Sequence, residues 1–142
     1  MRMYSRLVTA FAAVAALVSA APVQAQGLIA RVPFEFAVGD TNLPRDTYHL
    51  SRMNEHPEML LLRGDRTGAF VRTIEERVAR DGATPSLLFH RYGDRYFLRE
   101  IRWEGTARLD LPETKAERAA AERRADRAAA PRETVIIAAE LR

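Results

Sequence analysis

Short apolar runs recur between Leu28 and Trp103, and each is bounded by Gly, Pro, Asn or Asp. This spacing is typical of an antiparallel β domain, because its strands are short and its turns need residues that tolerate tight backbone conformations. The pattern predicts strands at residues 28–36, 47–53, 59–63, 69–74, 86–92 and 95–103. It predicts turns at 38–46, 54–58 and 63–68, and a longer polar loop at 75–85.

The composition changes at Pro112. Residues 112–130 have Ala as their only apolar side chain, with charges between, and this composition strongly favours a helix. Pro112 suits the helix start, and Glu113 is placed in the first turn, where the helix dipole favours an acid. An Ala face buries little area, so we expect the helix to be exposed, loosely docked or projecting. The β-branched tail, residues 133–141, is predicted to return as a last strand.

These elements predict a mainly β fold, either a small antiparallel β-sandwich or a partly open barrel of about six to eight strands, with one charged, Ala-rich C-terminal helix. The β domain is expected to span residues 26–111, followed by the helix at 112–130 and a strand or tail at 131–142 that packs on the β domain. The predicted core comprises Phe34, Phe36, Tyr48, Phe70, Phe89, Tyr96, Leu98 and Trp103.

Residues 1–25 have the pattern of a cleaved signal peptide. Arg2 and Arg6 form a positive segment, an apolar stretch runs from Leu7 to Ala21, and residues 23–25 read Val-Gln-Ala, a small-x-small cleavage site. The apolar stretch is shorter than the roughly 20 residues that span a bilayer, so no membrane span is expected after cleavage. The sequence therefore predicts export to the periplasm or the cell exterior, and a mature chain that begins at Gln26.

Removal of Arg2 and Arg6 lowers the formal net charge from +3 to +1. The remaining cations are interspersed with acids and form no basic stripe, which argues against a nucleic-acid partner. The chain has no Cys, so disulfide scaffolds and thiolate metal sites are excluded.

The segment 87–103, Leu-Leu-Phe-His-Arg-Tyr-Gly-Asp-Arg-Tyr-Phe-Leu-Arg-Glu-Ile-Arg-Trp, gathers several chemically active side chains. A two-residue turn of type II′ at Gly93-Asp94 would make it a hairpin, with Gly at the position that needs a positive φ. The predicted cross-strand pairs are Tyr92 with Arg95, His90 with Phe97 and Leu88 with Arg99, and the predicted core face carries Leu87, Phe89, Tyr96 and Leu98. His90 and Asp94 would lie roughly 13 Å apart along a strand, too far for an acid–base pair.

Other candidate sites have simpler structural explanations. Arg63-Gly64-Asp65 spells an adhesion tripeptide, but Gly-Asp also suits a turn between strands. The three histidines, His49, His56 and His90, are scattered without metal-ligand spacing, and neither serine outside residues 1–25 lies in a nucleophile elbow. The sequence therefore predicts no catalytic, cofactor-binding or metal-binding residue.

Two motifs resemble a family of small exported bacterial proteins of unknown function. The family pattern is V-P-F-x-F-x-V-G-x-x-x-L-P-x-G-x-Y, followed by H-R-Y-G-D-x-Y-F-L near a Trp. The matching residues are Val32, Pro33, Phe34, Phe36, Val38, Gly39, Leu43, Pro44, Tyr48, His90, Arg91, Tyr92, Gly93, Asp94, Tyr96, Phe97, Leu98 and Trp103. Asp46 replaces the usual Gly of the first motif, and it tolerates a left-handed conformation better than most residues. The resemblance implies export and a β fold, and it implies no activity.

Two functions remain open. The first is a non-enzymatic exported β domain that binds another protein or an envelope polymer. The second is a small hydrolase or lyase with a site around His90, Tyr92, Arg95 and Arg99. A deep pocket holding several of these side chains would favour the enzyme, whereas a filled core with a flat or edge-strand surface would favour the binding domain.

Overall fold

The computed structural model describes residues 27–78, 84–103, 107–127 and 132–142. The signal peptide predicted at residues 1–25 lies outside this part of the chain. Eleven strands and one helix are described. They are β1 (Leu28–Val32), β2 (Phe36–Val38), β3 (Thr41–Leu43), β4 (Asp46–Arg52), β5 (Met59–Arg63), β6 (Gly68–Arg72), β7 (Glu75–Val78), β8 (Ser86–Tyr92), β9 (Arg95–Arg102), β10 (Ala107–Asp110), α1 (Lys115–Asp126) and β11 (Glu133–Leu141).

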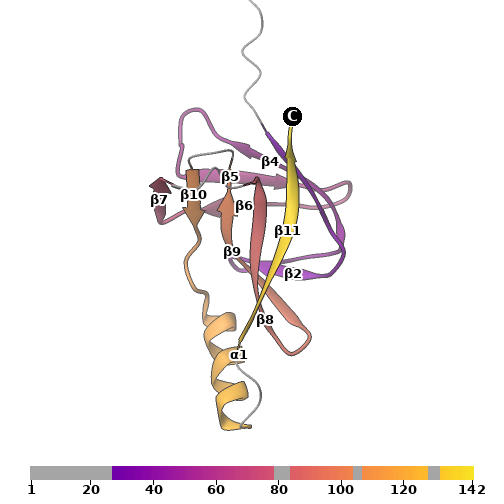
Figure 1. Ribbon diagram of the computed structural model, residues 1–142, viewed down its shortest axis with the longest axis vertical. Helices are drawn as coiled ribbons and strands as arrows, with labels where there is room; N and C mark the ends of the chain where they lie inside the picture. Colours follow the sequence, from indigo (N-terminus) through magenta and orange to yellow (C-terminus); the bar gives the residue numbers. More distant parts are fainter. Residues whose placement is uncertain (1–26, 79–83, 104–106, 128–131) are drawn as a thin grey trace, which may run out of the picture.

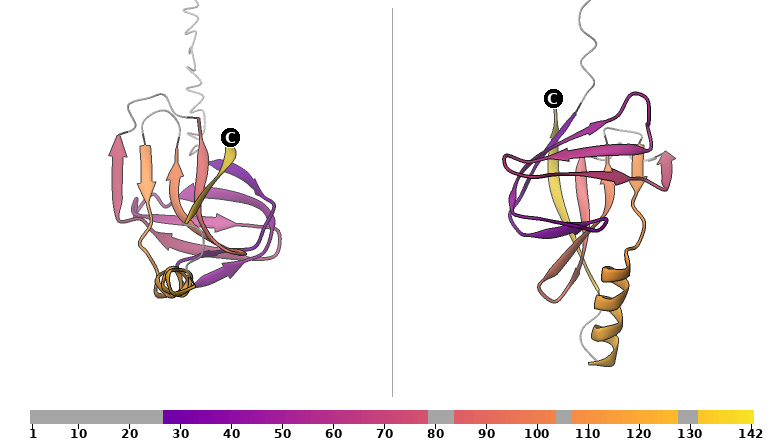
Figure 2. Two further views of the ribbon diagram at one scale, coloured as in Figure 1. Left: turned by 60° about the horizontal axis from the view of Figure 1, so that its bottom comes forward. Right: turned by 180° about the vertical axis from the view of Figure 1, so that it is seen from behind.

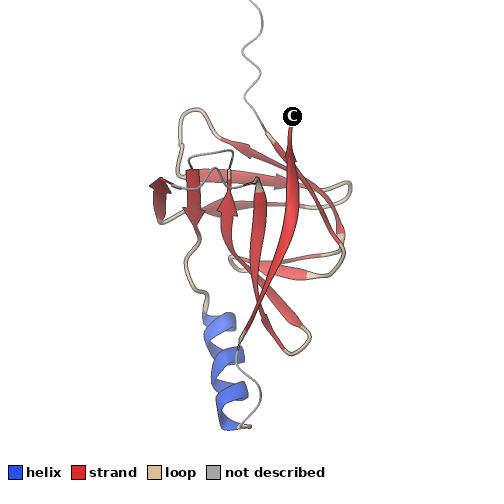
Figure 3. Cartoon of the chain, in the orientation of Figure 1, coloured by secondary structure: helices blue, strands red, loops and turns tan. Residues whose placement is uncertain are grey.

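The strands form one sheet that wraps into a nearly closed barrel (Figure 1). The main strand order is β3-β2-β9-β8-β11-β1-β4-β5-β6, and a branch runs from β9 through β10 to β7. All pairings are antiparallel except that of β2 with β9, where Ala37 is the partner of Phe97. The mainly β fold and its C-terminal helix confirm the sequence prediction, and the strand count exceeds the six to eight expected (Figure 3).

The interior of the barrel is filled with side chains. Tyr48, Phe36, Phe89, Leu28 and Leu62 are all less than 2% exposed, and they belong to one continuous core that lines both halves of the sheet. Phe34 and Tyr96 are half-buried and stack on each other beside this core, with ring centroids 3.8 Å apart. Phe70 is a correction to the predicted core. Its side chain is 63% exposed because it alternates with Ala69 and Val71, which face inward.

The predicted first strand, residues 28–36, is two strands. β1 ends at Val32 because Pro33 has no N–H to donate to a ladder, and β2 begins at Phe36 on a different part of the sheet. The predicted turn at 38–46 contains a second hairpin, in which Val38 pairs with Thr41 across Gly39-Asp40. Gly39 has φ 54°, and Gly93 in the other Gly-Asp hairpin has φ 68°, which confirms the positive φ expected at Gly93.

The predicted loop at 75–85 and the stretch after Trp103 also contain strands. β7 begins at Glu75 and pairs with β10, which in turn pairs with β9. Residues 79–83 of the predicted loop lie outside the described residues. β10 is only four residues long, and Leu109 within it is fully buried.

The helix is shorter than predicted and begins later. Thr114 is its N-cap, and the Thr114 side chain accepts a hydrogen bond from the backbone N–H of Glu117. Glu113 therefore precedes the helix, and Glu117 is the acid of the first turn. The expected helical residues 128–130 lie outside the described part. Figures 1 and 2 show the helix extending beyond one end of the barrel, beside the hairpin of β8 and β9.

The tail forms a strand, as predicted. β11 lies between β8 and β1 and pairs with both. Two backbone hydrogen bonds of 2.9 Å join Gly27 and Arg142, so the first and last described residues of the barrel lie side by side. No helix in the described residues is long and apolar enough to cross a membrane.

Candidate functional site

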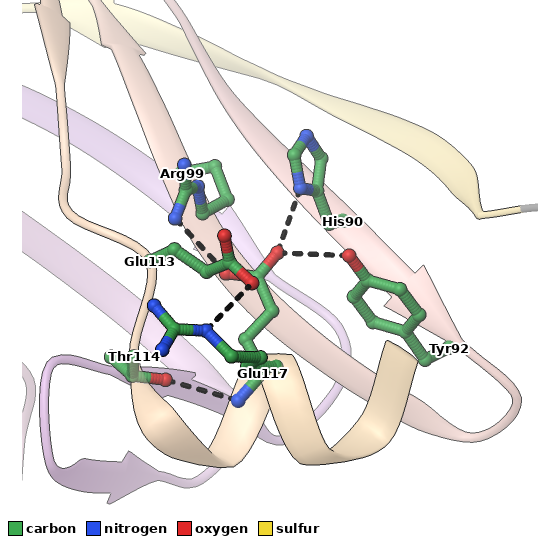
Figure 4. A network of polar contacts seen from close by, with 7 residues as sticks. His90, Tyr92, Arg99, Glu113, Thr114 and Glu117 are labelled. Atoms are coloured by element: carbon green, nitrogen blue, oxygen red, sulfur yellow. Dashed lines mark hydrogen bonds and ion pairs between the residues drawn. The ribbon is translucent and has the colours of Figure 1, made fainter. Parts of the chain in front are cut away.

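A buried carboxylate joins the helix to the β8–β9 hairpin (Figure 4). Glu117 is 1% exposed, and among the described residues it is the only charged side chain that is fully buried. Its first oxygen, Oε1, lies 2.8 Å from His90 Nδ1 and accepts a hydrogen bond of 3.2 Å from the Tyr92 hydroxyl. Its second oxygen, Oε2, accepts a hydrogen bond of 3.1 Å from Arg99 Nη1. We call His90, Tyr92, Arg99 and Glu117 the carboxylate cluster.

The carboxylate cluster keeps Glu117 ionised. Burial alone would raise the pKa of Glu117, but the hydrogen bond from His90 and the charge of Arg99 outweigh burial and hold that pKa below its ordinary value. Burial, and then the negative charge of Glu117, raise the pKa of Tyr92, so its hydroxyl stays protonated and donates. Because a carboxylate only accepts, His90 donates from Nδ1, so Nε2 is the ring nitrogen that can accept a hydrogen bond or a proton.

A β-bulge places Arg99 in this cluster. The register of β8 and β9 agrees with the prediction from Tyr92–Arg95 through Phe89–Leu98, and then shifts by one residue between Phe89 and Leu88. Phe89 pairs with Leu98 but Leu88 pairs with Glu100, so Arg99 is the extra residue, contrary to the predicted pair of Leu88 with Arg99. A bulge turns two consecutive side chains toward one face, and Arg99 and Glu100 accordingly both face away from the barrel core.

An open groove of about 290 Å³ adjoins the carboxylate cluster. Its lining residues are Ile74, Leu88, His90, Arg99, Glu100, Asp110 and Leu111. Glu100 and Asp110 are direct cross-strand partners, which places two acids side by side on the groove floor. Glu100 Oε1 is paired with Arg102 Nε at 2.7 Å and with Arg108 Nε at 3.1 Å. The groove thus holds polar groups that other side chains keep in place.

The helix also makes an apolar contact with the barrel, next to the carboxylate cluster. Ala120 packs with Ala37 and Phe97 in a small cluster separate from the main core, and Tyr92 covers it. Phe97 is 2% exposed although it lies on the outer side of the hairpin, because the helix covers it. The helix is therefore docked through its first half, by Glu117 and Ala120.

The structure brings together three of the four residues named for a possible enzyme site. His90, Tyr92 and Arg99 meet at Glu117. Arg95 lies exposed near the hairpin turn, with its guanidinium over the Phe97 ring at 5.3 Å, and has no ion pair with Glu117. Glu117 was missed because an acid in an Ala-rich helix is usually solvated. The sequence Thr114-Lys115-Ala116-Glu117 did contain a signal, since Thr-x-x-Glu marks a helix start and fixes the position of the Glu.

The remaining sequence candidates lie apart. His49 is exposed on β4, His56 is in a turn within 3.7 Å of Glu58, and His90 is in the carboxylate cluster. Within the described residues, no group of three or more His, Asp or Glu side chains could hold a metal ion. Gly64 has a structural role, because a Cβ there would lie 2.7 Å from Asp46 Oδ2, which accepts the backbone N–H of Asp65.

Comparisons with family models, with curated proteins and with solved structures found no match to this chain. The resemblance to a family of small exported bacterial proteins stays a prediction.

Proposed function

We propose that this chain is an exported, non-enzymatic β domain that binds another protein or an envelope polymer through the groove beside the carboxylate cluster. The observation that carries this proposal is the fixed geometry of His90 and Arg99. Both side chains line the groove and both are held from behind by the buried carboxylate of Glu117. Such groups lose little conformational freedom on binding, which favours affinity.

Two further features support binding rather than catalysis. The barrel interior is filled, so the ligand surface must be on the outside. The groove is also open at the surface, so a chain longer than the groove can pass through it.

Site-specific photocrosslinking tests the proposal. Benzoylphenylalanine replaces Ile74, whose exposed side chain stands at the groove, in the full-length chain expressed in its own host. The same probe at Phe70 is the matched control, since both side chains are 63% exposed and Phe70 does not line the groove. We expect a discrete adduct from position 74 only. No adduct at 74, or equal adducts at both positions, would contradict a binding site in the groove.

The second candidate function is a small hydrolase or lyase. The specific observation in its favour is the pairing of Glu117 with His90 Nδ1, which orients the imidazole and leaves Nε2 free to take a proton at the groove. Incubation of the purified protein with a panel of chromogenic ester, glycoside and uronate substrates tests it. Turnover that is lost in His90→Gln but kept in His49→Gln would establish the enzyme in place of the binding domain.

A further inference from the structure

The floor of the groove is one row of side chains across neighbouring strands. Leu88 on β8 pairs with Glu100 on β9, and Glu100 pairs with Asp110 on β10. The row therefore changes from apolar to acidic within the width of the groove. Arg99 lies beside it and adds hydrogen-bond donors, and His90 adds an acceptor at Nε2.

Two acids placed directly across a strand pair repel each other, so the pairing of Glu100 with Asp110 costs stability. Arg102 and Arg108 offset this cost at Glu100, and both contact the same oxygen, Oε1. Neither of these contacts uses Glu100 Oε2, which is a second acceptor of the same carboxylate. Glu100 lines the open groove, where its carboxylate can accept a hydrogen bond from a ligand.

The charges of the groove disfavour an ion of either sign. An anion attracted by Arg99 would meet the carboxylates of Glu100 and Asp110, and the charge of Arg99 is already engaged by Glu117. A cation attracted by the two acids would meet Arg99, and Glu100 is already paired with two arginines. Charged ligands would therefore pay a desolvation cost that the groove does not recover.

A neutral ligand rich in hydroxyl groups can bind both the carboxylates of the groove and the guanidinium of Arg99. Each hydroxyl donates one hydrogen bond and accepts others, so it can donate to an acid on the floor or to His90 Nε2 and accept from Arg99. Ile74 and Leu88 are the accessible apolar side chains of the groove, and they suit the C–H faces of sugar rings. The volume of about 290 Å³ is near the lower limit of small-molecule sites, which suits a short segment of a polymer.

We propose that the groove binds a segment of a neutral glycan. This inference rests on the proposed binding function and names its ligand class. The glycan segment lies over the row formed by Leu88, Glu100 and Asp110, with its hydroxyl groups on the polar side and its ring faces on the apolar side.

The test uses three tetrasaccharides of matched length and different charge, titrated into protein purified from the exported fraction. N-acetylated chitotetraose is neutral, fully deacetylated chitotetraose is cationic, and tetragalacturonate is anionic. Isothermal titration calorimetry gives the affinity of each, and amide chemical shifts locate it. We expect saturable binding of the neutral ligand, at least tenfold tighter than that of either charged one, with the largest shifts on β8, β9 and β10.

Two variants locate the ligand. Ile74→Ser removes part of the apolar wall, and Glu100→Gln removes the acceptor charge on the floor, and each should weaken neutral-glycan binding about tenfold. Phe70→Ser is the control, because Phe70 is equally exposed and lies outside the groove, and its affinity should equal that of the wild type. Unchanged affinity in both groove variants would overturn the site, and preferred binding of a charged tetrasaccharide would overturn the ligand class.

The photocrosslinking experiment separates this inference from the function on which it rests. If no tetrasaccharide binds but the photoprobe at position 74 gives a discrete protein adduct, the proposed ligand class is wrong. The binding function then stands, with a protein as the partner. If neither experiment detects a ligand, the proposed function is overturned as well.

Discussion

Glu117 places a charge where the described chain otherwise buries apolar side chains and two short polar ones, Thr73 and Ser86. Desolvation of a carboxylate is costly, and here three donors from β8 and β9 compensate for it. The helix has no large apolar side chain with which to bind the barrel, so this polar contact determines its position. The cost of burying Glu117 is recovered only when the helix sits at one place on the hairpin.

Replacement of Glu117 by Gln should therefore lower the free energy of unfolding by about 1–3 kcal/mol at pH 7, because the Gln amide cannot accept from Arg99 and His90 at once. Urea denaturation measures the change. Glu122→Gln, at an exposed position of the same helix, is the control and should alter stability by less than about 0.5 kcal/mol. Equal effects of the two substitutions would mean that the carboxylate cluster contributes nothing.

The pH dependence of this difference has a definite sign. The folded-state pKa of Glu117 lies below the ordinary value of 4.5, so its contribution to stability is present above that value. It is lost only as the pH falls below 4.5 through the folded-state pKa. The stability difference between wild type and Glu117→Gln should stay constant from pH 7 to 5 and shrink at lower pH. A difference that already disappears at pH 6 would contradict the lowered pKa.

Phe70 and Phe89 give a second residue-scale prediction. Phe89 is fully buried and packs edge-on against the Phe34 and Phe36 rings, whereas Phe70 is 63% exposed. Phe89→Ala should cost about 3–5 kcal/mol of unfolding free energy, and Phe70→Ala less than about 1 kcal/mol. Thermal or urea denaturation of both variants checks this ordering. A cost at Phe70 as large as that at Phe89 would restore Phe70 to the core in which the sequence pattern placed it.

At the scale of elements, the β8–β9 hairpin depends on its turn. Gly93 has φ 68°, and a Cβ at this position would meet only Arg124 Nη1 at 4.0 Å, so a larger residue is opposed by backbone strain rather than by crowding. Gly93→Val should cost about 1–2 kcal/mol of unfolding free energy, since β-branched residues tolerate positive φ poorly. Gly93→Asn should cost less, because Asn adopts this conformation more readily. If the melting temperatures of Gly93→Val and Gly93→Asn fall equally, backbone strain is not the cause of the destabilisation.

The helix is the element whose removal we expect the barrel to survive. No helical residue belongs to the main core, and only Glu117 and Ala120 of the helix are fully buried. Replacement of residues 114–130 by a flexible linker should leave a cooperative transition within a few degrees of the wild type, because His90 and Arg99 then become solvated rather than buried without a partner. Circular dichroism should show a smaller helical minimum. Loss of the cooperative transition would mean that the helix is required for folding of the barrel.

The sequence predicted the β fold, the final strand and the Gly93 hairpin, because alternation and turn residues are local signals. It missed β3, although Gly39-Asp40 repeats the Gly-Asp turn of Gly93-Asp94, and it missed β7 and β10, which are too short for a clear period. It did not predict the β-bulge at Arg99, since nothing in the local pattern marks an extra residue. The carboxylate cluster depends on this bulge and on the docking of a helix that is distant in the sequence. The spacing of residues along the chain therefore could not predict that these side chains meet.

At the scale of the whole molecule, export is the prediction on which the proposed partners depend. If residues 1–25 are a signal peptide, protein recovered from the periplasm or the medium should begin at Gln26. N-terminal sequencing or intact-mass measurement of the exported fraction checks this. Recovery of only the full-length chain, in the cytosol, would contradict export and would remove envelope glycans from the possible ligands.

The position of β11 has a consequence for when the barrel can form. Its two neighbours, β1 and β8, are both synthesised before it, and until it arrives the sheet order has a gap between them. Synthesis runs from the N-terminus, and β11 is the last of the described elements to be made. The half of the sheet that ends at β8 and the half that begins at β1 therefore cannot be joined before β11 is present. Pairing over such sequence distances is slow. We therefore expect the barrel to close only after translation has passed Leu141. If the chain is exported, as proposed, this delay would leave it unfolded for passage through a secretion pore.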